Sequence, residues 1–166
     1  FTQQYWGTTD TLKIRQKYYD FWKDAGLPLL ICNPFLISPS DSCPGHVWKV
    51  LVNGIDAQDG TPDPVGVGNA HFQVFFNRPM DTTFPPNLSF GVRQPYTQNA
   101  VADSAGWSAD RKEWHAVFPV QLFTGDGLQQ IRVAGARDPD GMEIPVEDTR
   151  FRFNIQAAGS ASIDFT

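Results

Sequence analysis

The sequence predicts a mainly β fold, and its composition carries that prediction. Of the 166 residues, 41% are hydrophobic, 13% are aromatic and only 19% are charged. The chain also contains 14 glycines and 13 prolines, which short strands separated by tight turns use in large numbers. A chain of this length buries one good core, or one core with a small appendage.

One stretch near the amino terminus predicts a helix. Ile14, Tyr18, Phe21 and Trp22 recur at helical spacing, which places four large apolar side chains on one face. The polar residues at 8–10 can cap its start. We expect the aromatic face to pack against another surface rather than to hold a ligand.

A proline-rich connector follows the helix and contains both cysteines, Cys32 and Cys43. They have no CxxC spacing and no histidine nearby to complete a zinc site. Two unrelated buried thiols are one interpretation, and a disulfide that restrains this Ser/Pro-rich segment is the other. We favour the disulfide, which would also indicate an oxidising compartment outside the cytoplasm.

From residue 46 onward the sequence has the pattern of short strands separated by turns. We expect them at HVWKVLVNG, HFQVFFNR, NLSFGVR, KEWHAVFPV, LQQIRVAGARD and RFRFNIQ, with a weak one near QNAVADS. Apolar residues alternate along three of them, for example at Phe72, Val74 and Phe76, so each of these has one buried face. Seven short strands with turn signals between them predict an immunoglobulin-like sandwich.

Charge and hydropathy narrow the classes of partner. The formal net charge is −5 with only 13 Lys and Arg residues, and no basic run occurs. Nucleic acid and anionic membrane surfaces are therefore poor partners. No apolar run approaches the roughly 20 residues that span a bilayer, so we expect no membrane insertion.

The strand-rich region carries three motifs in a fixed order. They are FNRPMD, then WSADRKEWHAVFP, then GDGLQQIRVAGARDPDGMEIPVEDTRFRFNI. As a set they resemble the bacterial Ig-like domain of S-layer and other surface proteins, which is similar in its PMD strand exit, its Trp-x-x-Asp turn and its D-x-x-G loop. The resemblance covers about residues 46–157 and implies a place outside the cell or on its surface.

A second set of motifs stands at the amino terminus. YWGT at 5–8 leads into the helix and then to NPFL at 33–36. This set resembles the segment that closes many secreted right-handed parallel β-helix proteins. Cys32 stands where that pattern commonly has an aromatic residue, and this departure favours its pairing with Cys43. The resemblance implies that the coils which the helix caps lie upstream of this chain.

Together the two resemblances divide the chain into four parts. We expect a capping segment with one α-helix at 1–36, a linker at 37–45, the Ig-like sandwich at 46–157, and a linker to a following domain at 158–166.

The segment Arg78-Pro79-Met80-Asp81 interrupts a predicted strand and could belong to an active site. Pro79 cannot donate to a sheet ladder and restricts Arg78 to extended conformations. Asp81 can accept a hydrogen bond from the backbone two residues on, and we expect Met80 to pack on the core. Strand exit therefore accounts for the segment, and we assign it no catalytic role.

The acidic segment DPDGMEIPVED begins like a calcium-binding loop. An EF-hand requires a bidentate Glu at position 12, and counting from Asp138 that position is Thr149. We therefore expect an Asp/Gly turn between the last two strands, with a structural cation at the loop as the alternative, and we assign no metal ligands.

Other chemistry-bearing patterns are weak. His46, His71 and His115 are isolated, and no nucleotide, zinc-protease or serine-hydrolase motif occurs. We therefore assign no catalytic residue and no cofactor. Trp48 and Trp114 lie in alternating strands and are expected in the core. Trp107, in the turn AGWSADRKEW, is the candidate ligand contact because an exposed indole can stack on a sugar.

These observations predict a non-catalytic, extracellular structural, spacer or adhesion module of a larger secreted or cell-surface protein. Its expected partners are adjacent domains of the same polypeptide, with self-association through the helix face and a carbohydrate as further candidates. The alternatives are an accessory region of a polysaccharide-degrading β-helix enzyme and a carbohydrate-binding module.

Overall fold

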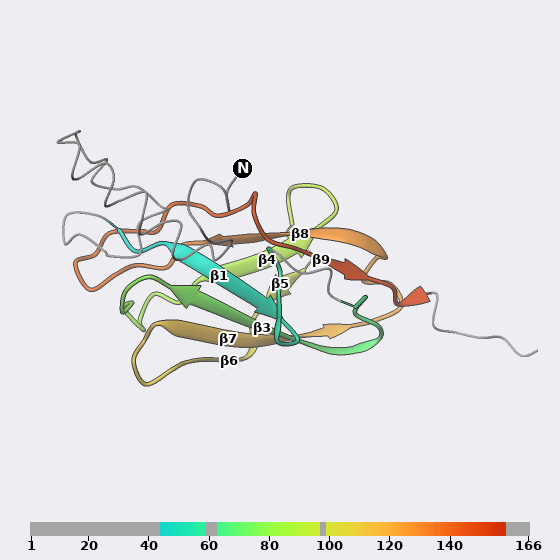
Figure 1. Ribbon diagram of the computed structural model, residues 1–166, viewed down its shortest axis with the longest axis horizontal. Coiled ribbons are helices and arrows are strands. Elements are labelled where there is room, and N and C mark those ends of the chain that lie inside the picture. Colours follow the sequence, from blue (N-terminus) through green and yellow to red (C-terminus); the bar gives the residue numbers. More distant parts are fainter. Residues whose placement is uncertain (1–43, 59–62, 97–98, 159–166) are drawn as a thin grey trace, which may run out of the picture. The chain divides into compact units, whose positions relative to one another are not determined.

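The computed structural model describes residues 44–58, 63–96 and 99–158 (Figure 1). The residues from Gly45 onward form one compact unit, and its described part is almost entirely strand and turn. The predicted helix, the capping segment and the disulfide between Cys32 and Cys43 lie outside the described residues. They stay predictions.

Nine strands make up the described part of the chain. They are β1 (Val47–Val52), β2 (Ile55–Asp56), β3 (Gly68–Phe76), β4 (Asn87–Gly91), β5 (Ala100–Val101), β6 (Asp103–Trp107), β7 (Glu113–Val120), β8 (Gly127–Ala134) and β9 (Arg152–Ile155). Within this part no helix is long and apolar enough to cross a membrane.

The strands form two antiparallel sheets. One contains five strands in the order β2-β1-β3-β7-β6, and the other contains four in the order β5-β4-β8-β9. Six of the predicted strands are confirmed as β1, β3, β4, β7, β8 and β9. The weak strand predicted near 98–104 is replaced by two short strands, β5 and β6. The chain leaves the four-stranded sheet after β5 and joins the five-stranded sheet as β6.

The core lies between the two sheets and is rich in phenylalanine. The ring of Phe72 in β3 stacks on Phe90 in β4 with centroids 5.7 Å apart, and it meets Phe153 in β9 edge-on at 5.5 Å. The predicted alternation of Phe72, Val74 and Phe76 is confirmed, because all three are buried. Burial of such rings is the main force that holds two sheets together.

Trp48 was expected in the core, and that expectation is wrong. Val47 pairs with Phe76 and Lys49 with Phe75, so β1 has one extra residue at Trp48, a β-bulge that redirects the side chain. The half-exposed Trp48 ring meets Phe75 edge-on at 6.1 Å instead. Strict alternation in the sequence could not reveal this bulge.

The two ends of the sandwich are occupied by different parts of the chain. At the proximal end, where β1 begins, Gly45 lies against the side chains of Met80 and Arg78. At the distal end, where β9 finishes, the Asp126 carboxylate accepts hydrogen bonds from the backbone nitrogens of Ala157 and Ala158. The described chain therefore enters and leaves the sandwich at opposite ends, with β1 and β9 running in the same direction (Figure 1).

Candidate functional site

The strand exit after β3 is built from backbone hydrogen bonds to three other segments. The Met80 nitrogen donates to the carbonyl of Arg111 at 2.9 Å, and the Asp81 nitrogen donates to the carbonyl of Arg137 at 2.8 Å. Met80 is fully buried, as predicted. Asp81 Oδ1 accepts hydrogen bonds from the backbone nitrogen and the hydroxyl of Thr83, which confirms its predicted role in the turn.

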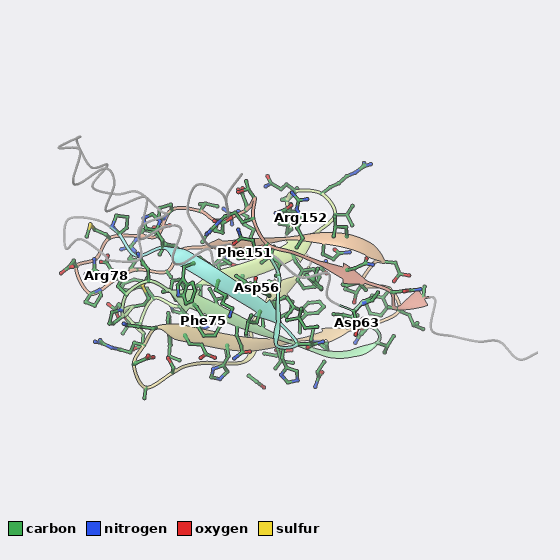
Figure 2. All side chains as sticks on the ribbon, viewed as in Figure 1. Asp56, Asp63, Phe75, Arg78, Phe151 and Arg152 are labelled. Atoms are coloured by element: carbon green, nitrogen blue, oxygen red, sulfur yellow. The ribbon has the colours of Figure 1, made fainter. Side chains whose placement is uncertain are left out.

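Arg78 joins this exit to the acidic loop. Figure 2 shows it at the proximal end of the sandwich, where its side chain is largely buried. Its Nη2 lies 2.8 Å from Asp140 Oδ2, and its Nη1 lies 3.4 Å from Oδ2 of Asp138, a fully buried carboxylate. The guanidinium thus neutralises two carboxylates that the sequence places about sixty positions further along the chain.

The acidic loop itself is a turn held by Asp138. Its Oδ1 accepts hydrogen bonds from the backbone nitrogens of Asp140 and Met142, and its carbonyl accepts from Gly141, which adopts the positive φ of 83° that the turn requires. The described residues contain no cluster of three or more His, Cys, Asp or Glu side chains placed to hold a metal ion. In the acidic loop the Arg78 guanidinium lies against the carboxylates of Asp138 and Asp140.

Trp107, the predicted ligand contact, ends β6 and is half-buried. Its ring packs on Phe76 with centroids 5.6 Å apart and belongs to the margin of the core. Trp114 is buried in the core, as expected. The ligand role of Trp107 stays a prediction.

His46 is a buried histidine at the start of β1. Its backbone nitrogen donates to Asn77 Oδ1 at 2.7 Å, and its side chain is almost fully enclosed. Burial lowers the pKa of His46, and the nearby Arg150 guanidinium lowers it further, while the Glu147 carboxylate acts in the opposite direction. The folded chain therefore favours the neutral imidazole.

We expect stability to fall as the pH is lowered below 6.5, the ordinary pKa of histidine. Because the folded pKa of His46 is lower than the unfolded value, only the unfolded chain gains a proton in that window, and the loss ends once the pH is below the folded pKa. Urea unfolding from about pH 8 to about pH 5 measures this. The variant His46→Gln should show a flatter profile, whereas the exposed His71→Gln should keep the original one. Identical profiles for all three proteins would contradict the expectation.

A pocket of about 600 Å³ opens on the outer face of the four-stranded sheet. Its floor comes from three adjacent strands, because Ser89 of β4 pairs with Arg132 of β8 on one side and with Ala100 of β5 on the other. Its wall comes from Gln94, Pro95 and Tyr96, which follow β4. The described residues that line it are Asn87, Ser89, Gln94, Pro95, Tyr96, Ala100 and Arg132.

A close approach of a ring to a glycine forms the wall of this pocket. A Cβ atom on Gly91 would lie 2.6 Å from Cδ1 of Tyr96, so only glycine lets the Tyr96 ring lie directly against β4. The Gln94 side chain donates to the Asp148 carboxylate at 3.2 Å. The sequence carried no signal for this pocket, since its residues come together only through strand pairing.

Comparisons with known proteins found little likeness. No family model and no curated protein sequence matches this chain. Among solved structures, domains 1–6 of the surface layer protein SbsC align with 66% of this chain and 13% of that one, at a TM-score of 0.40 and 18% identity. The crystal structure of the S-layer protein rSbsC aligns with 68% of this chain and 14% of that one, at a TM-score of 0.39 and 18% identity. This chain thus spans only a small part of the length of either structure.

Proposed function

We propose that this chain carries an immunoglobulin-like, non-catalytic spacer or adhesion module of a larger extracellular or cell-surface protein. Strand order supports the fold assignment. Among the seven longer strands, the first, second, fifth and fourth form one sheet and the third, sixth and seventh form the other. This arrangement is that of immunoglobulin-like sandwiches.

The observation that carries the spacer function is the path of the chain through the sandwich. The chain enters at the proximal end and leaves at the distal end, so tension applied through both ends pulls β1 and β9 along their own axes (Figure 1). The ladders of β1 with β3 and of β9 with β8 are antiparallel, and tension along these strands shears many hydrogen bonds at once. Modules of this geometry extend one after another in a chain.

Two further contacts at the ends suit the transmission of force. The Arg150 guanidinium donates to the carbonyl of Val47, which fastens the start of β1 to the segment just before β9. That guanidinium is also paired with Glu147 at 2.7 Å. At the distal end Asp126 holds the backbone of Ala157 and Ala158. The first and last segments of the sandwich are thus anchored by side chains as well as by sheet ladders.

Two acids of the described chain, Asp81 and Asp110, act in turns. Hydrogen bonds from the backbone and the hydroxyl of Thr83 lower the pKa of Asp81. The Ser108 hydroxyl and then the Lys112 backbone lower the pKa of Asp110. A general acid for glycoside cleavage needs a raised pKa, which neither of these two carboxylates has.

Single-molecule stretching of the full chain between its termini tests the spacer function. We expect one force peak for the sandwich, followed by the release of roughly 350 Å of chain, because an extended residue spans about 3.3–3.6 Å. As a control, pulling between residues 53 and 121, which lie near the distal end, should open the ladders one bond at a time and need less force. Equal forces in the two geometries would contradict the proposal.

The non-catalytic part of the proposal has its own test. We expect no release of reducing ends when the full chain is incubated with neutral or acidic polysaccharides. Turnover that disappears when one acidic residue among the described residues is changed to its amide would overturn this part and leave the spacer geometry standing.

A further inference from the structure

The pocket on the four-stranded sheet contains a cation, Arg132, that forms no ion pair with the described residues. The Asp148 carboxylate beside the pocket accepts a hydrogen bond from Gln94. Arg132 is half-buried, and the part of the chain that the structure describes places no carboxylate within ion-pair distance of it. A half-buried guanidinium that forms no ion pair with the described residues has lost part of its hydration on folding. An anionic group bound in the pocket would replace the hydration that the Arg132 guanidinium lost on folding.

A second cation continues the same surface. Arg152 of β9 (Figure 2) pairs with Gln130 of β8, two positions from Arg132 along the same outer face. Diagonal neighbours of this kind lie roughly 7–8 Å apart. Arg152 is exposed and likewise has no carboxylate partner within ion-pair distance among residues 44–58, 63–96 and 99–158. Two guanidinium groups on one face, neither in an ion pair with the described residues, favour a ligand that carries more than one negative charge.

The remaining lining suits hydroxyl groups. Asn87, Ser89 and Gln94 bring amide and hydroxyl groups that both donate and accept hydrogen bonds. The buried Tyr96 ring, held against Gly91, closes one side of the pocket with an apolar wall. A pocket of about 600 Å³ lies within the range of small-ligand sites.

We propose that this pocket binds an acidic oligosaccharide, with Arg132 holding the carboxylate of one uronic-acid residue and Arg152 attracting the charge of a neighbouring residue. Arg132 recognises a carboxylate because its planar fork can donate two parallel hydrogen bonds. The site goes beyond the spacer function, and it lies on a different sheet from Trp107. A module with this site would bind an acidic polymer and would also serve as a spacer between neighbouring domains.

An acidic peptide is the main rival ligand. An extended peptide commonly pairs with a free sheet edge through its backbone, whereas this pocket lies on the face of a sheet and presents side-chain amides, a hydroxyl and a ring. The lining therefore favours a ligand that is rich in hydroxyl groups.

Isothermal titration of the full chain with short oligomers of galacturonic or glucuronic acid tests the proposal. The matched probes are neutral glucose oligomers of the same length and an oligo-glutamate peptide. We expect the uronic oligomers to bind at least tenfold more tightly than either, with an affinity that weakens as salt is added. Equal binding of the neutral oligomers would overturn the assignment, and so would equal or tighter binding of the peptide.

Substitutions of lining residues test whether the uronic oligomers bind in this pocket. Arg132→Gln should weaken binding of the uronic oligomers about tenfold or more, Arg152→Gln should weaken it a few-fold, and Arg132→Lys should retain part of it because the charge remains. Gly91→Ala should weaken it by displacing the Tyr96 ring. Arg137→Gln, which changes an arginine paired with Glu143 outside the pocket, is the control and should bind normally.

Melting temperatures show which variants are folded. If Arg132→Gln does not fold, Arg152→Gln and Arg132→Lys decide the question. Normal binding by the folded pocket variants, or no binding of uronic oligomers by the unaltered chain at millimolar concentration, would overturn the proposal.

Discussion

Replacing Arg78 by methionine is expected to lower the free energy of unfolding by about 3–5 kcal/mol, because it removes one partner of a buried ion pair. Asp138 is fully buried, and the Arg78 guanidinium lies 3.4 Å from its Oδ2. Methionine fills much of the same space but leaves the carboxylate uncompensated inside the protein. Urea denaturation measured by intrinsic fluorescence gives the change in stability.

Two further variants separate the charge effect from general damage. The double variant Arg78→Met/Asp138→Asn should recover part of the loss, since it leaves no uncompensated charge at Asp138 and the amide oxygen can still accept the loop hydrogen bonds. Glu143→Gln is the matched control. It breaks the ion pair with Arg137, whose charged atoms are 3.7 Å apart and whose side chains are 43% and 51% exposed, and should cost below about 1 kcal/mol. A loss of similar size for Arg78→Met and Glu143→Gln would contradict this account.

Phe90→Ala is expected to destabilise the sandwich by about 3–5 kcal/mol, because it opens a cavity between the sheets. The Phe90 ring is fully buried and contacts three others, with centroids 5.7 Å from Phe72, 4.8 Å from Phe118 and 5.0 Å from Phe153. Those rings come from three different strands, so the cavity cannot close without movement of both sheets. Thermal and urea unfolding measure the effect.

The chain offers a matched control for Phe90 in a second phenylalanine. Phe123, in the loop between β7 and β8, is 84% exposed, so Phe123→Ala should change the free energy of unfolding by less than about 0.5 kcal/mol. If the two alanine variants lost similar stability, the core between the sheets would not be the main source of stability in this fold.

The sequence alone was enough to locate most of the strands and to orient three of them. Alternation at Phe72, Val74 and Phe76 is a local property, since neighbouring residues of a strand point to opposite faces whatever the strand pairs with. The turn at Asp81 was predictable for the same reason, because its hydrogen bonds reach only two residues along the chain. The predicted helix and disulfide lie outside the described residues and stay predictions.

Tertiary structure decided the features that join distant segments. The ion pair of Arg78 with Asp140 joins residues 62 positions apart, and the pocket floor exists only because Ser89 pairs with Arg132. The bulge at Trp48 depends on the register between β1 and β3. Local composition cannot specify register between strands, because register follows from how two buried faces and their connecting loops fit together. The sequence thus determined which faces are buried, and the packing of the sheets determined which charged and polar groups meet.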